Sequence, residues 1–491
     1  MKRADTIKAM LQKDEGAILI LWAVSLAVVL GIVALSFDFG RKASTQSELQ
    51  SYADQVALAA AGELDGKSDA ITRATNAAAN LIVDKQTFAT GSHALAGNSN
   101  YTLTFYKSLP SSDTASMASG STTNPALAAF AKVVVTPRTV PFTFMAAFDV
   151  LRGSATPNPA IGASAVAGFT QFACDITPLM FCIPSPSFKA KDNIGKMIKL
   201  RAGGGGAAFW GPGDFGFLDP SGLQLDPGGN CAGLNGAQKL ACLVGGSGAL
   251  TQCFSQRGVN TEPGQKVGLE NSAFNTRFDI YNSMLNSKQN NPIYAPAPNV
   301  IKGIKKRGGG SGNCIGTNFD RTTDTWPLPR DNCFYTSNCA NGNRFGDGVW
   351  NNATNGRPKY VLKNYGGTDP HPSAATRYDY YKAEIAAHGG AGSSTRILPA
   401  GRTETGRPMC SNQQSNDPDR RVVIAAGIDC TTNPVKGSMN NVPVQEFVKL
   451  FMTEIVGLDD PFDMYVEVVG SAESGSAGSG GIFHDVVQLY R

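Results

Sequence analysis

The sequence predicts an α+β (or α/β) fold: a single N-terminal transmembrane helix extends into an amphipathic helix, and a mixed α/β ectodomain follows. Three observations lead to this prediction. One long uncharged apolar stretch lies near the N-terminus, at residues 17–37. Short β-branched segments and helical patterns occur on both sides of the chain's middle. The middle itself is rich in Gly, Asn and Cys, which predicts a loop-dominated insertion.

The composition excludes several classes of protein. Of the 491 residues, 55 are Gly and 27 are Pro, so neither a coiled coil nor a long helical bundle fits most of the chain. The net charge of +4 is too small for this length to indicate nucleic-acid binding. Because 42% of the residues are hydrophobic, the chain can bury a core and is not disordered as a whole.

The apolar stretch from Ala17 to Phe37 predicts a membrane anchor. Its 21 residues carry no charge, and as a helix they span ~31 Å, which matches the hydrocarbon core of a bilayer. Basic residues are more frequent before the stretch than after it, which predicts a cytoplasmic N-terminus. A cleaved signal peptide is the alternative, but its apolar core is normally shorter. We therefore expect a cytoplasmic tail at 1–15 and an uncleaved signal anchor at 16–38.

The region after the anchor, residues 39–170, predicts helices packed on a small sheet. Apolar residues between Leu49 and Leu64 recur at steps of three and four, and no Gly or Pro interrupts residues 41–61. The anchor helix should therefore continue as one rod. A second helical pattern covers residues 71–82. Alternating or β-branched patterns predict strands at 101–106, 132–136 and 140–144.

All ten cysteines lie after residue 170, which predicts disulfide bonds in an oxidising compartment such as the periplasm. The chain contains no C-x-x-C and only four histidines, so a zinc site lacks its usual ligand pairs. The alternative is a set of buried reduced thiols in a cytosolic protein. The candidate disulfide cysteines are Cys174, Cys182, Cys231, Cys242, Cys253, Cys314, Cys333, Cys339, Cys410 and Cys430. Short separations favour Cys174 with Cys182, Cys333 with Cys339, and Cys410 with Cys430, and leave the other four open.

Residues 171–491 form the expected periplasmic ectodomain. The Cys-rich insertion covers about 171–415, and a regular α/β segment covers about 416–491. Within the regular segment, patterns predict strands at 421–426 and 464–469, an amphipathic helix at 444–456 and a closing segment at 482–490.

Several short motifs follow one another between Glu15-Gly16 and Leu64. After the apolar span come Asp38-Phe39-Gly40-Arg41, then Leu49-Gln50, Ala53-Asp54 and a run of small residues at 57–61. This order resembles the N-terminal signature of TadE/TadG-like Flp pilus-assembly proteins, especially the TadG-like branch. Beyond residue 64 the resemblance continues in patches. It implies an inner-membrane component of a tight-adherence pilus and secretion apparatus, with pilus-assembly or secretion membrane proteins, pilin subunits and the lipid bilayer as partners.

The resemblance and the helix pattern together give a set of candidate motif and helix-interface residues. Asp38 and Arg41 share a helix face and can pair at the outer interface, or they simply end the membrane segment. Small residues around Gly31 allow another helix to approach, although alanines of this kind also pack well on the protein's own sheet. Asp54 is either a partner contact or a solvated charge. The full set is Gly16, Gly31, Asp38, Gly40, Arg41, Gln50 and Asp54.

The sequence favours a protein that is not an enzyme. No G-x-S-x-G, H-E-x-x-H or P-loop motif occurs, and the string at 175–179 keeps only part of a D-x-S-x-S metal motif. We therefore expect no catalytic, cofactor or metal residues, no nucleic-acid partner and no small-molecule substrate. A surface adhesin or ligand-binding ectodomain is the alternative function. A membrane-anchored hydrolase whose site forms only on folding is the third.

Overall fold

The computed structural model describes residues 14–490 with gaps at 67, 111, 113–116, 118–119, 126, 175, 205–207, 220–230, 248–252, 256–257, 263–265, 309–311, 459, 461–462 and 473–482. It contains two compact units, Met1–Thr170 with Asp485–Arg491, and Gln171–His484. Most of the predicted cytoplasmic tail and the metal-motif residue Asp175 lie outside the described residues. The predicted fold class is confirmed, because one long apolar N-terminal helix precedes mixed helices and sheets.

The first unit combines helices with a small antiparallel sheet. Its elements are α2 (Asp14–Ala61), α3 (Ala70–Asn80), β1 (Val83–Lys85), β2 (Ala94–Ala96), η1 (Asn98–Asn100), β3 (Tyr101–Tyr106), β4 (Phe130–Val135), β5 (Arg138–Thr139), α4 (Phe144–Arg152), β6 (Ala160–Ile161), the first part of β7 (Ser164–Cys174) and most of β17 (Phe483–Leu489). The predicted strand at 140–144 is wrong: β5 ends at Thr139 and α4 begins at Phe144.

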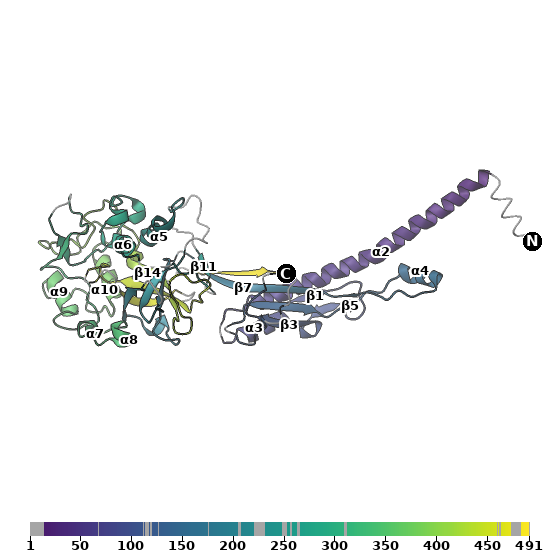
Figure 1. Cartoon of the computed structure of the whole chain (residues 1–491), viewed down its shortest axis with the longest axis horizontal. Helices are drawn as coiled ribbons and strands as arrows, with labels where there is room; N and C mark the ends of the chain where they lie inside the picture. Colours follow the sequence, from purple (N-terminus) through teal and green to yellow (C-terminus); the bar gives the residue numbers. More distant parts are fainter. Residues whose placement is uncertain are drawn as a thin grey trace, which may run out of the picture. The chain divides into compact units, whose positions relative to one another are not determined.

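The helix α2 is one continuous rod, as expected, and Figure 1 shows it uninterrupted. Its apolar side chains from Ile18 to Val33 are exposed, whereas those from Leu49 onward are buried on one face. Tyr52, Val56 and Ala60 belong to a core that also contains residues of β4 and α3. Among the described helices, α2 is the one that is long and apolar enough to cross a membrane. The helix therefore changes along its length from apolar on all sides to amphipathic.

The last strand of the chain returns to the sheet of the first unit. The strands β3, β4 and β7 pair antiparallel in this order, and β17 pairs with β7. The Tyr490 N–H donates to the Val166 carbonyl at 2.8 Å. A Cβ at Gly168 would lie 2.6 Å from the Phe130 ring and 2.8 Å from the Tyr490 ring, so this close approach requires glycine. The second unit is consequently inserted between two paired strands of the first.

The second unit is built around a six-stranded closed barrel with the order β10-β8-β14-β15-β16-β9. The barrel strands are β8 (Leu179–Cys182), β9 (Met197–Ala202), β10 (Asp214–Phe217), β14 (Val422–Ile428), β15 (Glu446–Met452) and β16 (Asp463–Ser471). The other elements are η3 (Ala190–Asp192), α5 (Gly236–Gly245), β11 (Cys253–Ser255), α6 (Val267–Ala273), η4 (Phe274–Phe278), η5 (Ser283–Leu285), η6 (Pro292–Tyr294), β12 (Ile304–Lys306), β13 (Phe319–Arg321), α7 (Asn332–Tyr335), α8 (Ala340–Asn343), α9 (Arg357–Tyr365), α10 (Arg377–Ala387) and η7 (Pro418–Arg421).

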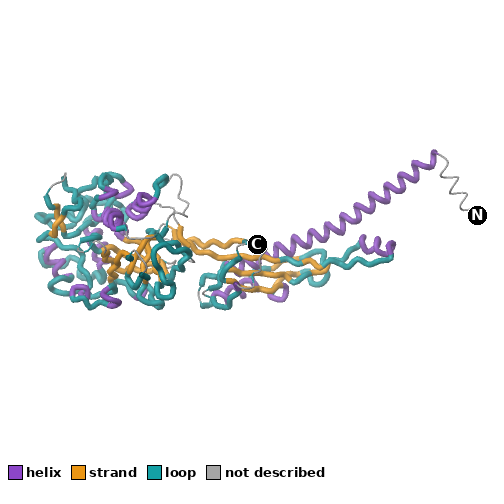
Figure 2. Tube along the Cα trace, viewed as in Figure 1, coloured by secondary structure: helices purple, strands orange, loops and turns teal. Residues whose placement is uncertain are grey.

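Both faces of the barrel strands are buried. Leu179 and Phe181 of β8 pack into one core, whereas Met180 and Cys182 between them pack into another. Figure 2 shows these strands in orange, with loops and short helices drawn around them in teal and purple. Because loops cover the outer face of the barrel, apolar residues follow one another along much of each strand and do not alternate with polar ones.

This double burial explains a wrong prediction. Residues 444–456 were expected to form a helix, but β15 occupies Glu446–Met452 and pairs antiparallel with β14 and β16. Apolar residues stand at nearly every position of the strand, so some of them, such as Phe447, Val448 and Phe451, match a helical spacing by chance. Short apolar runs of this kind do not distinguish a buried strand from a helix.

Four disulfide bonds are described, Cys182–Cys430, Cys231–Cys242, Cys314–Cys410 and Cys333–Cys339. The predicted Cys333–Cys339 pair is confirmed, whereas the predicted Cys174–Cys182 and Cys410–Cys430 pairs are wrong. The parallel pairing of β8 with β14 places Cys182 opposite Ile428 and so brings Cys430 within reach. Cys174 is also disulfide-bonded, and its backbone lies opposite that of Cys253 in the β7–β11 pair.

Candidate functional site

The motif that follows the apolar stretch holds the start of α4. The Asp38 side chain is only 2% exposed. Its Oδ1 accepts the Thr143 N–H at 3.0 Å, and its Oδ2 accepts the N–H groups of Phe144 and Met145 at 2.8 and 2.7 Å. The first N–H groups of a helix have no partner within the helix, and a carboxylate is well suited to bind them. Asp38 therefore caps α4 from a position about 100 residues earlier in the chain.

Arg41 contacts the same segment from the next turn of α2. Its Nη1 donates to the Thr143 hydroxyl at 2.7 Å, and its guanidinium lies 5.6 Å from the Phe88 ring centroid. The Phe37 and Phe144 rings meet edge to face with centroids 5.6 Å apart. We refer to Asp38, Arg41 and Thr143 as the α4 clamp. The clamp ties a folded helix to the point where the exposed apolar part of α2 ends.

A shallow, wide-open groove of about 600 Å³ runs along more than four turns of α2, from Ala43 to Leu58. It is lined by Ala43, Gln46, Ser47, Gln50, Ser51, Asp54, Gln55 and Leu58. Small exposed residues recur at steps of four, and polar side chains flank them. The Gln50 Nε2 donates to the Asp54 Oδ1 at 2.8 Å and to the Ser164 carbonyl at 3.0 Å. The groove therefore offers close approach and hydrogen-bonding groups, which suits a second helix.

The three predicted glycines also lie on α2. Gly16 falls in its first turn. A Cβ placed at Gly31 or at Gly40 would have nothing within 4 Å, so neither glycine is needed for packing within this chain. The sequence pattern did not point to Thr143 or to Ser47 and Ser51. The regular spacing of small residues at 43, 47 and 51 was the signal available for the groove, whereas nothing local marked Thr143.

The second unit contains buried charges that sequence reasoning did not identify. Arg377 is fully buried and donates to Asp331, to Glu467 at 2.9 Å and to the Pro329 carbonyl at 2.5 Å. Burial raises the pKa of Glu467, although its bonds to Arg377 oppose the shift. These donors and acceptors satisfy one another, which is typical of a structural network. Within the described residues, no group of three or more His, Cys, Asp or Glu side chains is arranged to hold a metal ion.

Glu384 of α10 is the centre of a second buried network. Its Oε1 accepts the hydroxyl groups of Tyr360 and Tyr365, each at 2.7 Å, and its Oε2 accepts the Asn299 amide at 2.6 Å. Burial raises the pKa of Glu384 to about 7, and the three hydrogen bonds only partly offset this effect.

We expect Glu384 to make the folded protein less stable as the pH rises from about 4.5 to about 7. In this range the unfolded chain releases the proton while the folded chain still holds it, so unfolding becomes more favourable by up to about 3 kcal/mol. Urea unfolding of the full-length chain in detergent at several pH values measures the effect. The Glu384→Gln variant should show a flatter pH dependence than the wild type, and an identical dependence would contradict the shift.

The first unit thus defines a class of protein in which a long apolar helix continues into a folded domain and presents a polar groove. Residues 16–63 match a family model described as Putative Flp pilus-assembly TadE/G-like, which confirms the resemblance for this segment. The match covers the apolar stretch, Asp38 and Arg41 of the clamp, and the whole groove. No curated protein and no solved structure gave a match.

Proposed function

We propose that this chain is a structural or assembly component of a Tad (tight adherence) Flp pilus or secretion apparatus. Residues 17–37 anchor it in the inner membrane, and its remaining bulk lies in the periplasm. The observation that carries the proposal is the family match, which falls on α2 with its exposed apolar stretch, clamp and groove. The disulfide bonds support the oxidising compartment, and the basic residues before the anchor support a cytoplasmic N-terminus.

The proposed mechanism depends on the rigidity of α2. Because one helix runs from the apolar stretch into the folded core, a displacement of the membrane segment is passed directly to the helices and sheet that pack on the rest of α2. The α4 clamp fixes the start of α4 against α2 at the point where the apolar stretch ends. The groove then receives a helix of another pilus-assembly protein or of a pilin subunit. No step requires bond chemistry, so the proposed role is not enzymatic.

A single added thiol tests both the location and the groove. The described cysteines leave none free, so Ser47→Cys introduces one reactive group on the exposed groove surface. We expect a membrane-impermeant maleimide to label it in cells whose inner membrane is intact. A photo-crosslinker attached to this thiol should then capture a pilus-assembly protein or a pilin, identified by mass spectrometry.

The matched control is Thr72→Cys, which places a thiol on an exposed residue of α3. It should be labelled equally but should not capture the same partner. Adding Gly31→Leu to the Ser47→Cys chain should lower the yield of captured partner, because a Cβ at this position has no neighbour within 4 Å in this chain and the added side chain would obstruct a partner helix. Labelling only after the inner membrane is opened would contradict the periplasmic location. If the thiol is labelled but the crosslinker captures neither a pilus-assembly protein nor a pilin, the groove does not bind such a partner and this part of the proposal is wrong.

A further inference from the structure

A second hollow lies in the second unit, beside the disulfide bond between Cys314 and Cys410. Its volume is about 510 Å³, which is within the range of small-molecule sites. Three stretches of the chain line it, residues 281–289, 314–318 and Cys410. We refer to it as the cystine pocket.

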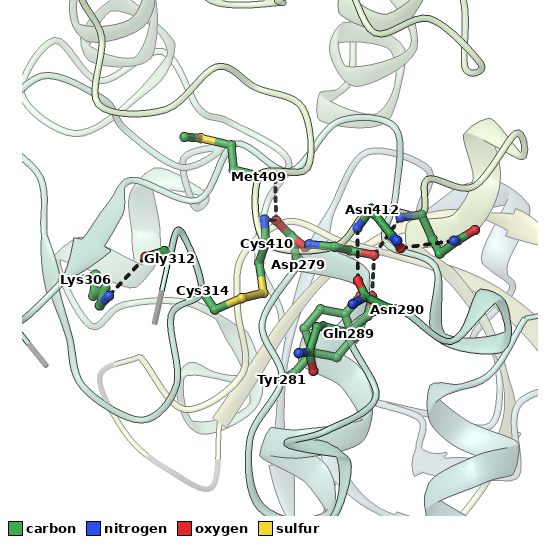
Figure 3. The surroundings of a disulfide bond; sticks show 12 residues. Asp279, Tyr281, Gln289, Asn290, Lys306, Gly312, Cys314, Met409, Cys410 and Asn412 are labelled. Atoms are coloured by element: carbon green, nitrogen blue, oxygen red, sulfur yellow. Dashed lines mark hydrogen bonds between the residues drawn. A yellow bond between two sulfur atoms is a disulfide. The ribbon is translucent and has the colours of Figure 1, made fainter. Parts of the chain in front are cut away.

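The walls of the cystine pocket are held in place by several independent links. The Asp279 carboxylate is 3% exposed and accepts the N–H groups of Met409, Cys410 and Ser411 at 2.7, 2.7 and 2.9 Å (Figure 3). The disulfide joins this loop to Cys314. A parallel backbone bridge between Ile280 and Ile315 connects the remaining two stretches. The backbone that forms the walls of the pocket is therefore fixed before any ligand binds.

None of the described residues that line the pocket has an acidic or basic side chain. It consists of tyrosine, asparagine, glutamine, serine, threonine, one glycine and the cystine. Sites for metal cations usually contain at least one carboxylate, and charge-assisted anion sites usually contain lysine or arginine. Asn286, Thr317 and Asn318 are exposed and supply hydrogen-bond donors and acceptors at the surface of the pocket. The lining therefore favours a neutral polar ligand.

Two buried oxygen atoms in the lining have no hydrogen-bond partner among the described residues. One is the Oδ1 of Asn282, whose side chain is more than nine-tenths buried, and the other is the Oε1 of Gln289. Burying an acceptor without a donor costs free energy, and most such groups in folded proteins are satisfied. Both atoms have almost no surface that water can reach, so the two amide groups must rotate toward the pocket before a ligand can bring donors to them and recover this cost.

We propose that the cystine pocket binds a sugar unit of a neutral glycan, whose hydroxyl groups donate to Asn282 Oδ1 and Gln289 Oε1. A sugar hydroxyl is neutral and can donate to one group while accepting from another, which matches a lining made of amides and hydroxyls. An apolar ligand would leave both oxygens buried and unpaired. The proposal goes beyond the pilus-assembly role and does not depend on it, because the pocket lies entirely within the second unit.

The test uses the full-length chain in lipid nanodiscs, since detergents with maltose head groups would compete for the pocket. Saturation-transfer NMR with maltose, cellobiose and N,N′-diacetylchitobiose measures binding in the millimolar range. We expect saturable binding of at least one of these sugars. Asn282→Leu and Gln289→Leu should each weaken it about tenfold or more, because leucine removes the acceptor at nearly constant volume.

A second measurement separates loss of the site from loss of the fold. Without sugar, the unfolding temperature of Asn282→Leu should stay the same or rise, since the deleted oxygen had no partner. Gln238→Leu changes an exposed amide of α5 outside the pocket and should leave binding unchanged. The proposal is overturned if none of the three sugars binds the wild type, if Asn282→Leu binds equally well, or if that variant unfolds at a lower temperature. Binding of tetra-alanine that Asn282→Leu abolishes would assign the pocket to peptides and also overturn it.

Discussion

The Asp38→Ala variant is expected to release the beginning of α4 from α2. The substitution removes the acceptor of three backbone N–H groups at residues 143–145. A hydrogen bond to a charged group contributes about 1.5–3 kcal/mol, and because the three bonds share one carboxylate we expect a total of about 3 kcal/mol rather than the full sum. Hydrogen exchange at these amides should therefore accelerate by about two orders of magnitude.

Two further variants should accelerate hydrogen exchange at residues 143–145 by smaller amounts, according to the number of hydrogen bonds that each one removes. Asp38→Asn keeps one acceptor oxygen and should accelerate exchange less than Asp38→Ala. Arg41→Ala removes one hydrogen bond to the Thr143 hydroxyl and should have the smallest effect. Exchange of the Ala131 and Val133 amides in β4 should be unaffected in all three. If Arg41→Ala has the largest effect, or if exchange at 143–145 does not change in Asp38→Ala, the capping role is wrong.

Removal of the Cys182–Cys430 disulfide is expected to be the most damaging change to the second unit. The two cysteines are 248 residues apart in sequence. By the loop-closure estimate, a bond over such a separation stabilises the folded state by about 5 kcal/mol, because it restricts the unfolded chain. The double variant Cys182→Ala/Cys430→Ala should lose most of this free energy of unfolding. Tryptophan fluorescence during urea unfolding measures it, since three of the four tryptophans, Trp210, Trp326 and Trp350, belong to this unit.

The matched control is the bond between Cys333 and Cys339, whose separation is 6 residues. The same estimate gives about 2 kcal/mol for this bond. Both double variants replace two cysteines by alanine, so the difference between them isolates the length of the closed loop. Equal losses for the two bonds would show that chain restriction does not account for their contributions.

The predictions that held were those for elements whose pattern is local. The rod of α2 follows from an uninterrupted run of helix-compatible residues, and its change from exposed to buried apolar side chains follows from the change in their spacing. The strand β3 shows a two-residue alternation, and β4 is rich in β-branched residues. In each case the residues that decide the structure lie next to one another in the chain.

The predictions that failed depended on distant partners. Short separation suggested that Cys410 pairs with Cys430, yet Cys410 pairs with Cys314 and Cys430 with Cys182. The strand pattern at 140–144 did not reveal that Asp38 caps a helix there. Gln50 and Asp54, which the motif singled out, lie in the groove, whereas nothing in the pattern singled out Ser47 or Ser51. Loop closure is only weakly sensitive to length, so separation in sequence is a poor guide to contact.

By itself, the sequence determined the parts of this protein that need no distant partner: the apolar helix, its amphipathic continuation, the family signature and the presence of disulfide bonds. Only the tertiary structure decided the closed barrel, the return of β17 to the first sheet, the pairing of the cysteines and the cap on α4. The physical reason is that a helix forms its hydrogen bonds within four residues. Barrel strands, disulfides and remote caps instead take their partners from wherever the folded chain brings them.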